Sequence, residues 1–174
     1  MDFFSTYNQQ VSERAAQNVP PLPLDATQTA EVIRLLLTND SRSKELKELL
    51  SERVSPGVDE SAKVKADFLD SLAQGKQSCQ AINPKEAIRL LGTMLGGYNI
   101  APLIGALKLA PELAQVAADA LKKTLLVYDA FGEIVELAKS NQYAQEILQS
   151  WAKAEWFTSR PKVPEKLTLT VFKI

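Results

Sequence analysis

The sequence of 174 residues contains no histidine and a single cysteine, Cys79. A disulfide within the chain is therefore impossible, and the Cys and His ligand sets of zinc and iron–sulfur sites cannot be assembled. Ser-His-Asp and Cys-His arrangements are excluded as well, because both use histidine as the general base. Catalysis would have to rest on carboxylates, lysine or tyrosine. The sequence predicts no catalytic, cofactor-binding or metal-binding residue in this chain.

An excess of charge and a long apolar run are also missing. The 20 basic and 21 acidic side chains leave a net charge of −1, so no global field attracts nucleic acid. The longest apolar stretch, residues 100–107, is far shorter than the roughly 20 residues that span a bilayer. The N-terminus lacks the basic start and apolar run of a secretory signal. We therefore expect a cytoplasmic protein without a membrane span.

Helical periodicity runs through residues 1–160. Apolar residues recur every three or four positions, as in the line formed by Tyr128, Phe131, Val135 and Ala138. Short helices with short connectors are typical of antiparallel hairpins stacked into a superhelix of the HEAT type. Residues 31–38 nearly repeat as residues 86–93, which gives weak support for repetition, since the spacing of 55 exceeds a HEAT unit of roughly 40 to 47. The predicted fold class is all-α.

The sequence predicts the first residues of two helices from their capping side chains. Asp25 followed by Gln28 predicts a capping box, and Asn83-Pro84 followed by Glu86 predicts another, with the carboxylate returning to the cap amide. Losing such a cap costs about 1 kcal/mol. The two sites are expected to fix where these helices begin.

The last 14 residues change pattern. Residues 161–174 begin with a proline and then alternate apolar and polar positions with β-branched side chains. A single strand is not stable without a sheet. We therefore divide the chain into a helical domain, residues 1–160, and a linker with a β-like tail, residues 161–174, that belongs to a next domain.

Gly96-Gly97-Tyr98-Asn99 is predicted to form a tight corner between two helices, because glycines end the preceding helix and adopt angles that side chains forbid. Asn99 is expected to satisfy freed backbone groups, and Tyr98 to bury its ring with the hydroxyl at the rim. A phosphate cradle is disfavoured, since neither GxGxxG nor GxxxxGK[ST] is present. Gly92 is expected to permit close helix packing.

Large aromatic and basic residues near the end of the chain are candidates for an interaction surface. Trp151 and Trp156 are expected in the core or at a domain junction. Basic residues concentrate at Lys122-Lys123 and from Arg160 onward. A solvated face is the ordinary interpretation of such groups, and contact with nucleic acid is the alternative. The candidate surface comprises the corner together with Trp156 and Arg160.

Several segments together carry a resemblance to a known family. They are residues 12–16 (SERAA), 23–26 (PLDA), 53–60 (RVSPGVDE), 91–100 (LGTMLGGYNI), 151–157 (WAKAEWF) and 165–172 (EKLTLTVF). In this order they resemble the N-terminal HEAT-like domain of bacterial aconitase B, the bifunctional aconitate hydratase and 2-methylisocitrate dehydratase. Ala101 departs from the family pattern, which carries histidine there.

The resemblance implies a parent lyase of the citric acid cycle that converts citrate to isocitrate through cis-aconitate. Its four-iron four-sulfur cluster would be held by three cysteines of later domains, and residues 165–172 would enter the swivel domain. Residues 1–160 would then be a non-catalytic domain that shapes access to the active site.

The resemblance also implies partners. They are the swivel and catalytic domains of the same polypeptide, a second copy in a homodimer, other metabolic enzymes and, as the alternative function, RNA bound by the cluster-free enzyme. Binding through phosphates weakens steeply with salt, whereas an apolar protein interface does not, so salt dependence separates the two classes.

Overall fold

The structure is a computed structural model that describes residues 3–124 and 126–154, and it is all-α over those residues, as predicted. Its helices are α1 (Phe3–Ala15), α2 (Ala26–Leu37), α3 (Ser43–Glu52), α4 (Glu60–Ala73), α5 (Pro84–Leu91), α6 (Ile100–Ala106), α7 (Pro111–Leu121), α8 (Ala130–Leu137) and α9 (Gln142–Lys153). The predicted β-like tail, residues 161–174, lies outside the described residues.

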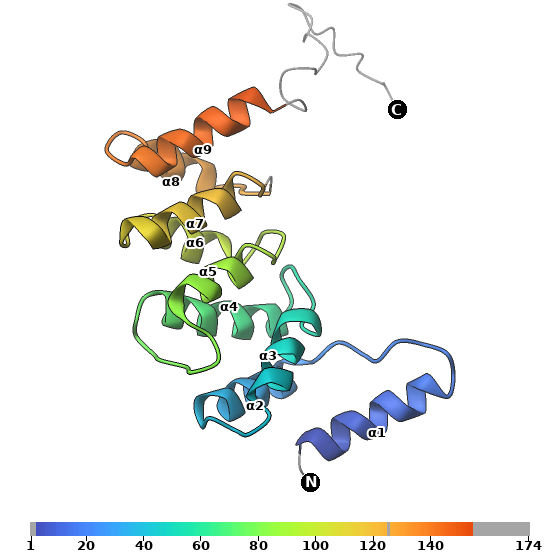
Figure 1. Ribbon diagram of the computed structural model, residues 1–174. Coiled ribbons are helices and arrows are strands. Elements are labelled where there is room, and N and C mark those ends of the chain that lie inside the picture. The colour runs from blue at the N-terminus through green and yellow to red at the C-terminus, as the bar shows by residue number, and fades with distance from the viewer. Residues whose placement is uncertain (1–2, 125, 155–174) are drawn as a thin grey trace, which may run out of the picture.

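Helices α2 to α9 form four antiparallel hairpins that stack in chain order, consistent with a HEAT-like superhelix (Figure 1). Within the stack α2, α4, α6 and α8 make one layer, and α3, α5, α7 and α9 make the other. The loops that follow α3, α5 and α7 therefore emerge on the same side. The near repeat of residues 31–38 and 86–93 does not mark equivalent positions, because it falls on α2 in one layer and α5 in the other.

The capping box at Asp25 is present as predicted. The Asp25 carboxylate accepts from the Gln28 N–H at 2.7 Å, and the Gln28 side chain accepts from the Asp25 N–H at 3.1 Å. Only half of the second box forms: Asn83 accepts from the Glu86 N–H at 2.9 Å.

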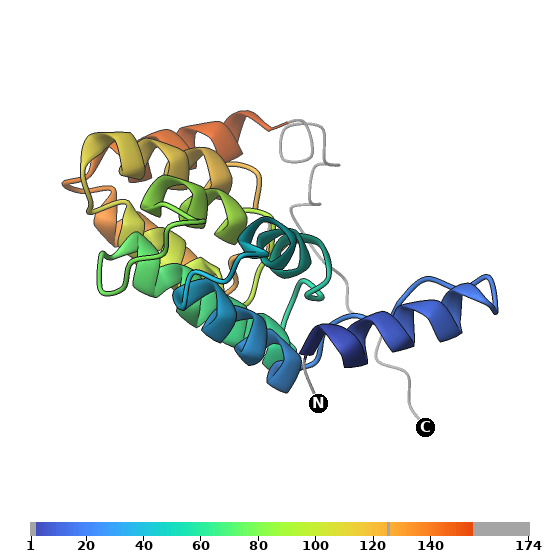
Figure 2. The ribbon, with the colours of Figure 1, turned by 60° about the horizontal axis from the view of Figure 1, so that its bottom comes forward.

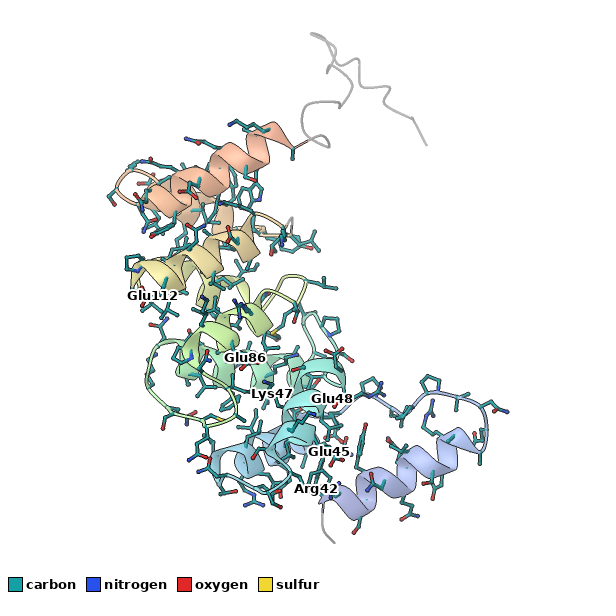
Figure 3. All side chains as sticks on the ribbon, viewed as in Figure 1. Arg42, Glu45, Lys47, Glu48, Glu86 and Glu112 are labelled. Carbon is teal, nitrogen blue, oxygen red and sulfur yellow. The ribbon has the colours of Figure 1, made fainter. Side chains whose placement is uncertain are left out.

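The carboxylate of Glu86 does not return to the cap, contrary to the prediction. It meets the Lys47 ammonium of α3 at 2.6 Å, and Figure 3 shows these two side chains lying between α3 and α5. The Lys47 partner carries a full positive charge, whereas the cap amide is neutral, so the pair with Lys47 adds a Coulombic attraction between the two hairpins.

Side-chain hydrogen bonds to backbone carbonyls connect successive hairpins. The Trp151 indole N–H, in a side chain only 8 % exposed, donates to Leu121 O at 3.2 Å. The Asn141 amide donates to Leu107 O at 2.9 Å. Both carbonyls lie at helix C-termini, and Leu121 O also accepts from the Thr124 N–H at 3.0 Å. Trp151 is a core residue, as expected.

The apolar line predicted along α8 lies mostly on its outer side. Tyr128, Phe131 and Val135 are 74, 49 and 37 % exposed, whereas Ile134 is fully buried. The helix packs through the face that carries Ile134. Periodicity indicated the helix, and the packing decides which of its faces meets the core.

Helix α1 extends away from the stack (Figure 2). The first two turns of α1 attach this helix to the rest of the protein. Phe4 and Tyr7 are buried there, and the Arg42 guanidinium carbon lies 3.3 Å from the Phe4 ring centroid. The proline-rich connector to α2 is fixed by Arg53, which donates to Pro21 O and to Leu22 O.

Candidate interaction surface

The corner between α5 and α6 is built from consecutive left-handed residues. Gly96 and Gly97 have φ angles of +113° and +85°, and Leu95 also adopts a positive φ, of 63°. Helix α5 ends earlier than predicted, at Leu91, with Gly92 as its C-cap. The glycine pair therefore shapes the turn and does not itself end the helix.

Gly92 allows α5 and α7 to approach closely, as predicted. A Cβ atom at this position would lie 2.8 Å from the Cβ of Ala120 and 3.2 Å from Arg89 O. Contacts under 3.0 Å do not occur between real Cβ atoms, so any side chain here would push the two helices apart.

The corner is held between the loops of the neighbouring hairpins. A Cβ at Gly97 would lie 2.7 Å from Val58 Cγ1 and 3.1 Å from Gly57 O. On the opposite side, a Cβ at Gly96 would lie 3.1 Å from Leu126 O. Both glycines are therefore required for three loops, which follow α3, α5 and α7, to pack against one another.

Asn99 and Tyr98 take opposite orientations in this corner. Asn99 is fully buried, and its side-chain amide donates to Leu91 O at 2.8 Å, so it satisfies a freed backbone group as expected. Tyr98 is 40 % exposed, and the prediction that its ring is buried is wrong. The next residue, Ile100, is 5 % exposed, so the buried side chains of this corner are those of Asn99 and Ile100.

Exposed apolar side chains gather on these loops. The six residues come from the turn after α3, the corner after α5, and the turn after α7 with the beginning of α8, all on one side of the stack (Figure 1). We call this set the loop ridge: Val58 (73 % exposed), Leu95 (67 %), Tyr98 (40 %), Leu126 (52 %), Tyr128 (74 %) and Phe131 (49 %).

Sequence reasoning found only Tyr98 as a surface candidate on this ridge. Val58 and Leu95 each adjoin a glycine of a turn, and apolar residues in turns were a signal that could have identified them. Their gathering into one surface depends on the stacking of the hairpins. Phe131 connects the ridge to the core, since its ring stacks on Trp151 with a centroid separation of 6.2 Å.

The other predicted surface candidates are Trp156, Arg160 and the adjacent lysines Lys122 and Lys123. Trp156 and Arg160 lie outside the described residues. The Lys122 ammonium is 3.3 Å from an Asp119 oxygen and 3.0 Å from a Glu146 oxygen, so this lysine bridges α7 and α9. One of the two adjacent lysines considered for nucleic-acid contact is therefore engaged in ion pairs within the chain.

The residues present do not fit an iron–sulfur cluster. Such clusters are held by several cysteine thiolates. Cys79 is half-buried, and its thiol lies 3.8 Å from Leu36 O. Among residues 3–124 and 126–154, three or more His, Cys, Asp or Glu side chains nowhere gather in a way that could hold a metal ion. Nor is any helix of this described part long and apolar enough to cross a membrane.

Known proteins match the chain along almost its whole length. The family model described as the aconitate B N-terminal domain matches residues 6–157. Aconitate hydratase B of Salmonella typhimurium is 54 % identical over 170 residues, which are 97 % of this chain and 20 % of the relative. The enzymes of the same name from Escherichia coli and Helicobacter pylori are 52 and 48 % identical over 97 and 99 % of the chain.

This chain spans about a fifth of the length of each of these relatives. The family match covers all of α2 to α9, and so includes the corner and the whole loop ridge. The chain belongs to the aconitate B N-terminal domain family.

Proposed function

We propose that this chain is a non-catalytic binding domain of an aconitate hydratase B polypeptide, and that its loop ridge docks against the swivel and catalytic domains of that polypeptide. The carrying observation is the ridge itself: six exposed apolar side chains on interlocked loops. Large groups of exposed apolar side chains are uncommon on a monomer and mark interaction sites.

The ridge is suited to binding because it is fixed in advance. Gly96 and Gly97 pack without space for a Cβ between the loops on either side. Loops that are already ordered lose little entropy when a partner covers them, which favours affinity. Burying one large apolar side chain contributes roughly 1.5–3 kcal/mol, so covering even part of the ridge supports a stable contact.

A domain of the same polypeptide is the partner that these features favour. The relatives are about five times longer than this chain, and a covalent connection raises the effective concentration of the remaining domains to roughly the millimolar range. The docked domain would shape access to the active site elsewhere in the polypeptide. Self-association into a homodimer and contact with other metabolic enzymes are further roles for the surfaces that docking leaves open.

In this proposal the chemistry belongs to the parent enzyme. It would interconvert citrate and isocitrate through cis-aconitate, and dehydrate 2-methylisocitrate, with a four-iron four-sulfur cluster bound outside residues 1–174. The donor set described above supports this division, since one half-buried cysteine cannot hold such a cluster. The chain by itself would be inactive.

The RNA-contacting alternative has less support. The chain carries a net charge of −1, and Lys122 is paired with two carboxylates. Phosphate binding needs available cations in a group. We therefore propose protein binding, and not RNA binding, as the main function of this domain.

Sedimentation velocity tests this assignment. The chain is run alone, with the remaining polypeptide expressed separately, and with RNA, at low and high salt. We expect a complex with the remaining polypeptide that persists at high salt, since the ridge is apolar. Complex formation with RNA alone, lost as salt rises, would support the alternative class and contradict docking.

Variants then locate the surface. The triple change Val58→Ser, Leu126→Ser and Tyr128→Ser removes ridge contacts without touching buried residues, and should weaken the complex at least tenfold. Leu22→Ser is the matched control, because Leu22 is 46 % exposed but lies on the connector between α1 and α2. Equal weakening by the control, or none by the triple variant, would remove the ridge as the docking surface.

A further inference from the structure

Lys65 is a buried cation in the middle of α4. The residue is 2 % exposed, and its ammonium donates to Ser51 O, in the last turn of α3, at 3.2 Å. No carboxylate of the described residues lies within 4.0 Å of this ammonium. Lysine is almost never fully buried unless paired, because removing a charge from water is costly. One carbonyl oxygen satisfies one of the three ammonium donors.

A cavity of about 320 Å³ lies beside this lysine, between the first two hairpins. Ser51 and Lys65 both line it, and the Lys65 ammonium and the Ser51 carbonyl are hydrogen-bonded to each other. The rest of the wall is mixed. Val54, Pro56, Leu90 and Met94 contribute its apolar part, and Glu52 and Thr93 contribute polar groups. Its volume is at the lower end of the range of small-molecule sites, roughly 300–1,000 Å³.

The charge state of Lys65 favours an anion. Burial lowers the pKa of Lys65 to about 8, and the charge of Glu52 acts in the opposite direction. At neutral pH most Lys65 side chains therefore remain protonated. A protonated, buried lysine attracts a negative group more strongly than a lysine in water, because the local dielectric constant is lower.

We propose that this cavity binds a short-chain monocarboxylate, with the carboxylate paired to Lys65 and the alkyl part against Val54, Leu90 and Met94. The apolar part of the wall accommodates a tail of a few carbons. Glu52 is exposed and also lines the cavity, so a second carboxylate on the ligand would meet a like charge. Monocarboxylates are accordingly preferred over dicarboxylates.

An NMR titration at pH 7 and constant ionic strength tests the proposal on the 174-residue chain. The probe is propionate, and propionamide serves as its neutral control. We expect saturable shifts with propionate at the backbone amides of Val54, Thr93 and Met94, and at least tenfold weaker binding of propionamide. Succinate should bind more weakly than propionate.

Three variants identify the group responsible. Lys65→Met should lower propionate affinity at least tenfold. Lys63→Met is the matched control on the same helix, because Lys63 is exposed and pairs with Asp67 at 2.5 Å, and it should leave affinity unchanged. Glu52→Gln should tighten binding several-fold by removing the like charge.

The proposal is overturned if propionate produces no saturable shifts, if propionamide binds as well, or if the folded Lys65→Met variant binds propionate like the unchanged chain. Should Lys65→Met fail to give a dispersed spectrum, Glu52→Gln decides. Unchanged or weakened binding in Glu52→Gln would contradict the assigned electrostatics.

Discussion

The side-chain amide of Asn99 donates to the carbonyl of Leu91 at 2.8 Å, in a fully buried position. Leu91 is the last residue of α5, and Asn99 directly precedes α6. The Asn99 carbonyl in turn accepts from the Leu103 N–H at 3.1 Å. One residue therefore joins the end of one helix to the beginning of the next across the corner.

Removing this hydrogen bond should destabilise the domain. In Asn99→Ala the Leu91 carbonyl keeps the Met94 N–H, at 3.2 Å, and loses the second of its two donors. Losing one such hydrogen bond costs about 0.5–1.5 kcal/mol. Urea unfolding followed by circular dichroism measures the change. Asn8→Ala, on the exposed side of α1, is the control and should stay within about 0.5 kcal/mol. A loss equal to that of the control would show that the corner does not depend on Asn99.

Gly97→Ala should be destabilising by about 1–2 kcal/mol from the left-handed backbone alone, and by more because its Cβ would lie 2.7 Å from Val58 Cγ1. Gly132→Ala is the matched comparison, since Gly132 lies within α8 with no atom within 4 Å of its added Cβ. It should stabilise by about 0.5–1 kcal/mol. Thermal unfolding of both variants checks the opposite signs.

The close approach of α5 and α7 predicts a coupled pair. Gly92→Ala should cost about 1–3 kcal/mol, because its Cβ would lie 2.8 Å from that of Ala120. Combining it with Ala120→Gly should recover part of that loss, so the two changes should be non-additive by at least about 0.5 kcal/mol. Additive free energies of unfolding would mean that the helices separate without strain.

Tyr98→Ala should lower the free energy of unfolding by only about 1 kcal/mol, because the residue is 40 % exposed and part of its surface is already in contact with water. Its effect should appear in binding of the remaining polypeptide, as a weaker complex in sedimentation. Chemical unfolding and sedimentation of the same preparation separate the two effects. A large drop in stability with unchanged binding would restore a purely structural role for this side chain.

Lys65 gives a defined dependence of stability on pH. Its pKa is about 8 in the folded chain and 10.5 when exposed, so between these values the unfolded chain holds a proton that the folded chain has lost. Stability must then rise with pH in this window, relative to Lys65→Met, which cannot titrate. Urea unfolding of both proteins from pH 7 to 10.5, without carboxylate buffers, measures the difference. A constant difference would contradict a lowered pKa.

Local signals in the sequence were sufficient to predict where most of the helices begin. Asp25 and Gln28 form their capping box because the two residues are three positions apart. The prolines of the connector between α1 and α2 prevent a continuous helix there, because proline lacks the backbone N–H that a helix interior uses. The absence of histidine and the single cysteine likewise limited the available chemistry without any knowledge of the fold.

Other features depended on residues far apart in the chain. The Glu86 carboxylate pairs with Lys47 of α3 and not with its own cap amide, and Tyr98 is 40 % exposed while Asn99 beside it is fully buried. Lys65 lies on a helix with both charged and apolar positions, and its burial comes from the packing of α2 and α5 against α4.

The sequence by itself determined where most helices start and which catalytic chemistries are excluded, because caps, prolines and missing residue types act within a few positions. The tertiary structure alone decided that Val58, Leu95 and Leu126 meet on one ridge. Stacked hairpins bring every second loop to the same side, and that juxtaposition arises from packing between elements, which no local pattern encodes.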